Sequence, residues 1–234
     1  MADAFGRLVS LFSTRTILLL TRVFHRFGWM SQYQPLPHVS FGGASFSSRI
    51  YGRLDAIRDN LGSGHHFGMD IGCNNGFYVF SLAGPDRLMY GIEGADDIFQ
   101  VFLAAKRMFT PGNVIPLNMY VTPDNARGLP ECDFTILMAV FHHWARLYGE
   151  GPALDMLSTV LQKTRQTLFF EVPFARDSGA NYRDCLPDRD ADDPEQWWRA
   201  WFATQGWTSM APIFQLNRTL YRIDQSTPSA GSNL

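Results

Sequence analysis

The residues best suited to chemistry follow a short apolar run near residue 70. The segment Phe67–Phe77 reads F-G-M-D-I-G-C-N-N-G-F, so an acid, Asp70, precedes a turn that contains Gly72 and Gly76. Glycines accept a left-handed backbone and let a ligand approach the main chain, and the start of a following helix supplies unpaired N–H groups. Asn74 also reaches the left-handed conformation better than most residues. The segment therefore predicts a ligand-binding turn between a strand and a helix.

A second acid closes the next apolar run. Glu93 ends the segment Y-G-I-E-G and lies 23 residues after Asp70. That is close to the separation of about 20 residues expected for a ribose-binding carboxylate, and one carboxylate can accept hydrogen bonds from both hydroxyls of a diol. A nicotinamide-dependent oxidoreductase is a disfavoured alternative, because its turn would carry G-x-G-x-x-G whereas this turn carries G-x-N-x-G. A purely structural turn is the other alternative.

Two histidines provide a candidate base. His142 and His143 occur in A-V-F-H-H-W, after an apolar run at 134–140. Because a histidine pKa lies near neutrality, either could take a proton from a hydroxyl during a reaction. The alternative is that one of them caps a helix or packs beside Trp144. We predict no metal site here, because no third ligand has a recognisable spacing.

Glu171 ends a later apolar run, in F-F-E-V-P. We predict that it binds substrate or pairs with Arg176, and a structural role is the alternative.

Short apolar runs alternate with helical periodicities along the chain. Strands are predicted at 66–71, 88–92, 114–117, 134–140, 167–172, 207–214 and 218–223, and helices at 48–61, 76–83, 96–109, 152–162 and 196–202. This alternation argues for an α/β fold with a parallel sheet covered by helices. Residues 184–195 carry six acids and are predicted to form an exposed loop.

The turn at 70–76 resembles motif I of class I S-adenosylmethionine (SAM) dependent methyltransferases, usually written D/E-x-G-x-G-x-G, with Asn74 in place of the middle glycine. The segment Phe202–Trp207 and the two strand-like runs after it resemble the helix, Gly-aromatic and hairpin ending of the same superfamily. The resemblance extends from about His65 to Asp224. It implies a Rossmann-like, seven-stranded mixed sheet of order 3-2-1-4-5-7-6 between helices, preceded by an N-terminal helical extension.

The resemblance also implies SAM as methyl donor and S-adenosylhomocysteine (SAH) as product. Asp70 would help to hold the turn and the ammonium end of the cofactor, and Glu93 would bind the ribose hydroxyls. Asn118 and Met119 occupy the region that often contacts adenine, although the acid usual in the family is absent there. The residues assigned to the cofactor are Asp70, Gly72, Cys73, Asn74, Gly76, Glu93, Asn118, Met119 and Ala139.

The predicted function is SAM-dependent methyl transfer to a hydroxyl or phosphate acceptor, such as a small molecule or a glycan. The segments F-H-H-W, E-V-P and R-T-L-Y-R look most like small methyltransferases that modify glycans or other hydroxyl- or phosphate-bearing acceptors. The alternative is a protein that binds SAM or SAH without turnover and serves as a partner or scaffold.

Composition limits the other classes. The 234 residues are 46% hydrophobic and 18% charged, which suits one α/β domain, and the net charge of −2 gives no strong signal for nucleic-acid binding. The three cysteines are far apart in the sequence and match neither a disulfide framework nor a metal-ligand spacing. A cytoplasmic location is therefore expected.

The N-terminal segment differs from the remainder. Four arginines and one acid fall within the first 34 residues, and a helix over 1–30 would have one broad apolar face. Such a helix could lie on an anionic membrane surface, or pack on its own domain or on a second subunit. We predict a linker that ends at residue 47 and carries Tyr33 towards the substrate, a methyltransferase domain at 48–225, and a disordered tail at 226–234.

Overall fold

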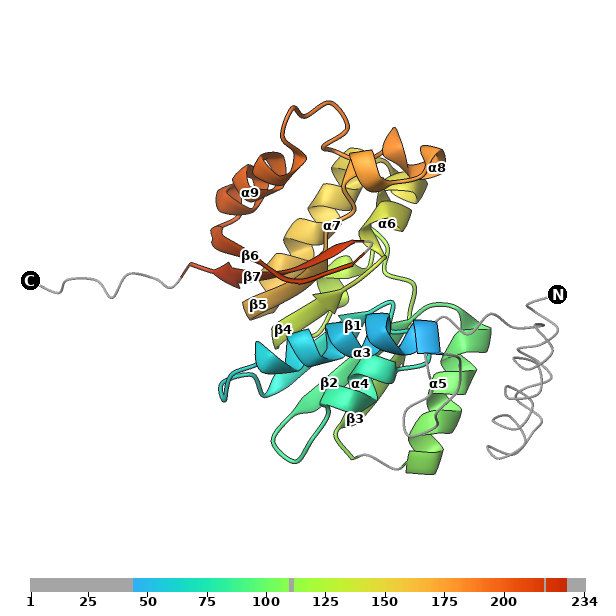
Figure 1. The fold of residues 1–234 in the computed structure, drawn as a ribbon. Helices are drawn as coiled ribbons and strands as arrows, with labels where there is room; N and C mark the ends of the chain where they lie inside the picture. Colours follow the sequence, from blue (N-terminus) through green and yellow to red (C-terminus); the bar gives the residue numbers. More distant parts are fainter. Residues whose placement is uncertain (1–43, 110–111, 217, 227–234) are drawn as a thin grey trace, which may run out of the picture. The chain divides into compact units, whose positions relative to one another are not determined.

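The computed structural model describes residues 44–109, 112–216 and 218–226 (Figure 1). The amphipathic helix predicted within residues 1–30 and the substrate contact predicted for Tyr33 lie outside the described residues, as does nearly all of the predicted tail. Within the described part of the chain, no helix is both long enough and apolar enough to cross a membrane.

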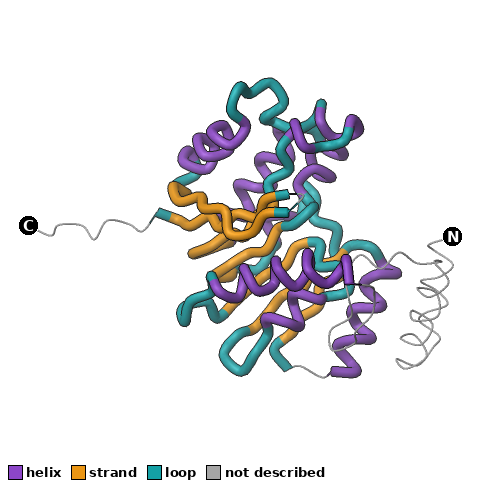
Figure 2. Tube along the Cα trace, viewed as in Figure 1, coloured by secondary structure: helices purple, strands orange, loops and turns teal. Residues whose placement is uncertain are grey.

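The chain forms a mixed sheet of seven strands in the order β3-β2-β1-β4-β5-β7-β6. Figure 2 draws the strands in orange. β1 pairs with β2, β2 with β3 and β4 with β5 in parallel, whereas β7 is antiparallel to both β5 and β6. The strands are β1 (Phe67–Ile71), β2 (Leu88–Glu93), β3 (Val114–Asn118), β4 (Cys132–Leu137), β5 (Thr164–Glu171), β6 (Trp207–Gln215) and β7 (Thr219–Gln225). The predicted mixed sheet and its strand order are confirmed.

The chain divides into two compact units, at Val121 and Thr122. Unit 1 contains β1–β3, and its helices are α3 (Ala44–Asp59), α4 (Phe77–Leu82) and α5 (Asp96–Phe109). Unit 2 contains β4–β7, and its helices are α6 (Phe141–Tyr148), α7 (Glu150–Lys163), α8 (Ala180–Arg183) and α9 (Pro194–Thr204), with 3₁₀ turns at Ala126–Gly128 and Ala175–Asp177.

Close packing of helices against the sheet in unit 1 depends on a glycine in β2. A Cβ atom added at Gly91 would lie 2.5 Å from the ring of Phe102 in α5 and 3.0 Å from Val79 in α4. Both helices therefore cover the same face of β2. Gly91 leaves room for the Phe102 ring, and that ring also lies against Gly76 at the start of α4.

An aromatic cluster forms the core of unit 2. The buried ring of Phe170 in β5 contacts Phe141 of α6 and both Trp198 and Phe202 of α9 at centroid distances of 5.5–6.0 Å. Edge-to-face contacts of this kind add to the stabilisation from burial itself. Trp198 is fully buried, so packing accounts for this tryptophan.

Some predicted boundaries were wrong. The fourth strand ends at Leu137 rather than at residue 140, because Ala139 adopts a left-handed conformation (φ 55°) and α6 then begins. Residues 184–195 are not wholly an exposed loop. Asp188 is 1% exposed and accepts a hydrogen bond from the Ala175 N–H, and α9 starts at Pro194. The count of acids in this segment could not reveal that backbone partner.

Gly76→Ala tests the packing of this turn. Gly76 has a φ of 85°, and an added Cβ would lie 2.5 Å from the Phe102 ring, so we expect the free energy of unfolding to fall by about 1–3 kcal/mol. Gly84→Ala is the matched control, because a Cβ atom added at Gly84 would have nothing within 4 Å. Urea denaturation followed by circular dichroism would measure both, and equal stabilities would contradict the assigned geometry.

Candidate functional site

The register of β1 and β2 determines where the predicted turn leaves the sheet. Asp70 lies opposite Gly91, and Ile71 lies opposite Ile92. The N–H groups of Gly72 and Cys73 then both donate to the Ile92 carbonyl, at 2.8 and 3.0 Å. The turn therefore starts at the level where β2 ends.

The turn contains three left-handed residues at alternate positions. Gly72, Asn74 and Gly76 have φ values of 71°, 54° and 85°. The left-handed conformation expected for Asn74 is confirmed, and it explains how an asparagine replaces a glycine in this pattern.

The Glu93 carboxylate joins the turn to the end of β2. Its Oε2 accepts a hydrogen bond from the Asn74 N–H at 2.9 Å, and its Oε1 accepts one from the Ala95 N–H at 2.8 Å. The two backbone donors fix the position of the carboxylate. Each oxygen keeps a second lone pair, so the group can still accept hydrogen bonds from a ligand diol.

Asp70, at the start of the turn, is a buried carboxyl with one oxygen unpartnered by the described residues. It is 3% exposed, and its Oδ2 has no hydrogen-bond partner among the described residues. Burial, and then the nearby Glu93, raise the pKa of Asp70 well above its ordinary value. A cation placed beside Oδ2 would reverse both effects, because it stabilises the charged carboxylate.

Cys73 is not a reactive thiol in this setting. Its side chain is fully buried, and burial followed by the charges of Asp70 and Glu93 raises the pKa of the Cys73 thiol well above its ordinary value. A thiol of this kind stays protonated, so Cys73 contributes backbone groups and shape to the turn.

The end of β3 lies beside Glu93. The Met119 N–H donates to the Glu93 carbonyl at 3.0 Å, and the Asn118 side chain donates to Asp96 at 2.8 Å. Tyr120 follows and is 67% exposed, and its ring lies so close to Gly94 that an added Cβ would be 2.4 Å away. The sequence analysis missed Tyr120, although a glycine directly after a strand-end acid was a signal of close packing.

All but one of the residues assigned to the cofactor belong to unit 1, namely Asp70, Gly72, Cys73, Asn74, Gly76, Glu93, Asn118 and Met119. The hydrogen bonds and register above place the turn, Glu93 and Met119 together. The remaining predicted residues, Ala139, His142, His143 and Glu171, belong to unit 2. Ala139 is a non-glycine residue in a left-handed conformation, which costs of the order of 1–3 kcal/mol and often marks a functional segment.

The two histidines lie in the first turn of α6. Their ring centroids are 4.3 Å apart, and Tyr182 of α8 meets His142 and His143 edge-on at 4.7 and 5.4 Å. His142 is buried whereas His143 is exposed. The His142 Nδ1 atom has no hydrogen-bond partner within the described ranges.

Cations surround this pair. Burial, then His143 and then Arg218 lower the pKa of His142 to about 3. Burial, then Arg146 and then Arg218 lower the pKa of His143 as well. Both imidazoles are therefore neutral at pH 7. A base works best when its pKa is near the working pH, so His142 is a weak base.

Glu171 pairs with Arg218 and not with Arg176. The Glu171 carboxylate is buried, and its Oε2 lies 3.7 Å from an Arg218 guanidinium nitrogen. Arg176 instead lies 3.8 Å from Asp177 and over the ring of Phe174, so the predicted pairing with Glu171 was wrong. Sequence reasoning missed Arg218 and Tyr182, since neither follows a parallel strand in the chain.

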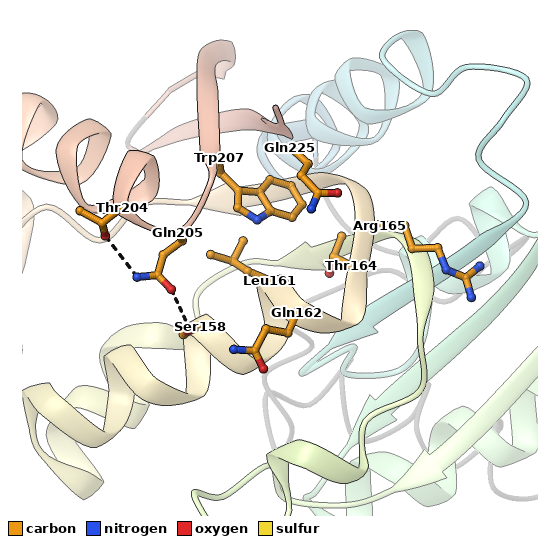
Figure 3. Close-up of a pocket in the computed structure, with 9 residues that line it drawn as sticks. All are labelled: Ser158, Leu161, Gln162, Thr164, Arg165, Thr204, Gln205, Trp207 and Gln225. Atoms are coloured by element: carbon orange, nitrogen blue, oxygen red, sulfur yellow. Dashed lines mark hydrogen bonds between the residues drawn. The ribbon is translucent and has the colours of Figure 1, made fainter. Parts of the chain in front are cut away.

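A separate pocket of about 410 Å³ lies at the other ends of the strands in unit 2 (Figure 3). Thr164 and Trp207 begin the strands that border it. At one side of it, Gln205 accepts a hydrogen bond from Ser158 and donates one to Thr204. Ligands of open α/β sheets bind at the carboxyl ends of strands, so we do not assign this pocket to the site. Among the described residues, no three His, Cys, Asp or Glu side chains are grouped to hold a metal ion.

Comparison with known proteins settles the fold. No family model matches the chain, and no curated protein matches it. The chain is similar to the structure of the bifunctional kinase-methyltransferase WbdD, with a TM-score of 0.64 and 18% identity over 91% of this chain and 46% of that chain. It is also similar to magnesium protoporphyrin IX methyltransferase (ChlM) from Synechocystis PCC 6803 with bound SAH, with a TM-score of 0.57 and 15% identity over 90% of this chain and 99% of that chain. The chain has the class I methyltransferase fold.

EvdMO1 is a third protein with a similar structure, at a TM-score of 0.56 and 11% identity over 88% of this chain and 47% of that chain. The chain spans about half the length of the WbdD chains it matches. The structural similarity identifies the methyltransferase fold. The sequence identities are too low to assign residue roles, so the roles of the site residues are argued from their geometry in this chain.

The pH dependence of stability tests the buried state of Asp70. Because its pKa is raised in the fold, the unfolded chain releases the proton first as pH rises past the ordinary value of 3.8. The Asp70 contribution to the free energy of unfolding therefore falls as pH rises from there to the raised pKa, and then levels.

We expect Asp70→Asn to remove this fall, so that the variant gains stability relative to the wild type between pH 4 and pH 7. Urea denaturation at several pH values would measure the difference. Parallel curves for the two proteins would show that Asp70 is not held in the neutral form.

Proposed function

We propose that the chain is a SAM-dependent methyltransferase that transfers the methyl group to an oxygen acceptor, a hydroxyl or a phosphate of a small molecule or glycan. The observation that carries the proposal is the buried Asp70 Oδ2, without a partner among the described residues, beneath a turn of three left-handed residues. A solved structure with a similar fold, ChlM, contains SAM, which supports this choice of donor.

The residues of unit 1 fit the parts of SAM. The Asp70 carboxylate would receive the ammonium group, whose positive charge offsets the effects that raise the Asp70 pKa. Glu93, already fixed by the Asn74 and Ala95 N–H groups, would accept hydrogen bonds from the ribose hydroxyls. Gly72 and Cys73 would lie along the methionyl part, and Asn118 and Met119 along the adenine.

SAM supplies a methyl group on a sulfonium, which leaves as a neutral thioether, so the protein chiefly has to position the reactants and exclude water. His142 and His143 remain our proposed catalytic residues in unit 2, with Glu171 and its partner Arg218 beside the acceptor. For a hydroxyl acceptor, the exposed His143 is the better base, because the His142 pKa of about 3 leaves little affinity for a proton. A phosphate acceptor needs no base.

Calorimetric titration tests the cofactor assignment. We expect the wild-type chain to bind SAM and SAH, and Glu93→Gln to weaken both by at least about tenfold, because the charged acceptor for the ribose hydroxyls is lost. Glu131→Gln changes a surface carboxylate of unit 2 that pairs with Arg165, so it should leave binding unchanged. Tight binding that survives both Glu93→Gln and Asp70→Ala would refute the assigned site.

Turnover separates an enzyme from a scaffold. The full chain with methyl-labelled SAM and fractionated cell extract should form SAH and a labelled product, and heat-denatured protein should form neither. Tight SAM binding without SAH formation from any fraction would favour the alternative, a partner or scaffold that only binds the cofactor.

A further inference from the structure

We propose that the methyl acceptor presents an oxyanion, a carboxylate or a phosphate ester, and that Arg218 of the β6–β7 hairpin binds it beside the two histidines of α6. This inference rests on the proposed function and specifies that the acceptor oxygen is already ionised, which adds a carboxylate to the possible acceptors and removes a neutral hydroxyl.

Arg218 has N–H donors that a ligand could use. Its side chain is 28% exposed, and its contact with Glu171 is 3.7 Å long, beyond the 2.7–3.2 Å of an ordinary hydrogen bond. The guanidinium group carries five N–H donors, and none of them makes a hydrogen bond to a described residue. Glu171 therefore orients Arg218 without saturating it, and a planar oxyanion can be bound through two parallel N–H groups.

The surroundings of Arg218 favour an anion. Arg218 lowers the pKa of both His142 and His143, and so lies close enough to act on both. Arg146 supplies a second cation from α6, with its guanidinium 5.4 Å from the Tyr182 ring centroid. Glu171 is the single carboxylate among these six side chains, which also include two guanidinium groups and two imidazoles with lowered pKa values.

The same surroundings are poor for a general base. A histidine that accepts a proton usually has a carboxylate partner, which stabilises the imidazolium. Here the charges that act on His142 and His143 include Arg218 and Arg146, which destabilise it. Neutral imidazoles can instead donate an N–H to the bound acceptor, and the His142 Nδ1 has no partner for this role among the described residues.

The reaction balances without a base when the acceptor is already ionised. The C–S bond of SAM breaks and its electron pair goes to sulfur, while a lone pair of the oxyanion forms the new O–C bond. No proton is transferred. With a hydroxyl acceptor the same two bonds change, and one proton must also leave the acceptor oxygen. The neutral histidines beside two cations match the first reaction.

Anion titration of the full chain, labelled with ¹³C at histidine, tests this inference. Sodium phosphate and sodium acetate are added separately at fixed pH and ionic strength, and the ring resonances of His142 and His143 are followed. We expect saturable shifts with at least one of the two anions. Saturation with phosphate alone points to a phosphate ester acceptor, and saturation with acetate points to a carboxylate.

Arg218→Gln should weaken this apparent affinity by at least about tenfold, because it removes a charged hydrogen-bond donor, and Arg218→Lys should weaken it less. Arg165→Gln, the same change at an exposed arginine beside the pocket of Figure 3, should match the wild type. Absence of saturable shifts with both anions, or equal affinities in wild type and Arg218→Gln, would overturn the inference.

Calorimetric titration with SAM keeps the two proposals separate. Arg218→Gln should bind SAM as the wild type does, which also shows that the variant is folded. Loss of anion binding together with intact SAM binding supports the role of Arg218. A wild-type chain that does not bind SAM would contradict the proposed function. The anion titration measures the contribution of Arg218 to anion affinity and does not require the cofactor.

Discussion

The Glu93 carboxylate bonded to the Asn74 backbone is the constraint on which the cofactor turn depends. The N–H groups of Gly72 and Cys73 also bond the turn after β1 to the Ile92 carbonyl of β2. With the Glu93 bond, the left-handed Asn74 is fixed at 2.9 Å from an acid that still has lone pairs for a ligand. The Glu93 side chain thus helps to fix the turn, and in the proposed function it also accepts hydrogen bonds from the ligand. Removing that side chain would disturb both, so its structural and functional roles cannot be separated by deletion alone.

Charge is distributed differently in the two units. In unit 1, burial and then the nearby Glu93 raise the pKa of Asp70, an arrangement that suits a ligand with positive charge. In unit 2, burial lowers the pKa of both His142 and His143, Arg218 lowers both further, and Arg146 lowers that of His143. The two guanidinium groups suit an anion. A sulfonium donor and an oxyanion acceptor are the reactants that would match these two environments.

The sequence predicted the parts that depend on local pattern. The positions of most strands, the left-handed Asn74 and the strand-end position of Glu93 follow from apolar runs, glycine positions and the spacing of acids. The strand order did not follow from these patterns and was implied by the resemblance to class I methyltransferases. The pairing of Glu171 with Arg218 did not follow, because it depends on the antiparallel register of β5 and β7, which places Glu171 opposite Leu220. Spacing in the chain favoured Arg176 instead. The short helix α8 carries Tyr182 to the histidines, and its four residues have no periodicity to read.

Two features of the chain oppose stability and bear on the proposed function. Burying the Asp70 carboxyl without a hydrogen-bond partner for Oδ2 among the described residues is unfavourable, and a left-handed alanine at position 139 adds backbone strain. An asparagine and a glycine would relieve these penalties if only the fold mattered. In the proposed function, a cationic ligand would supply the missing partner of the Asp70 carboxyl and would favour its charged form. The strained residue ends β4 one turn before the histidines, where it fixes the direction in which α6 starts. Within the proposed function, a cationic ligand beside Asp70 and an acceptor near the start of α6 would account for both penalties.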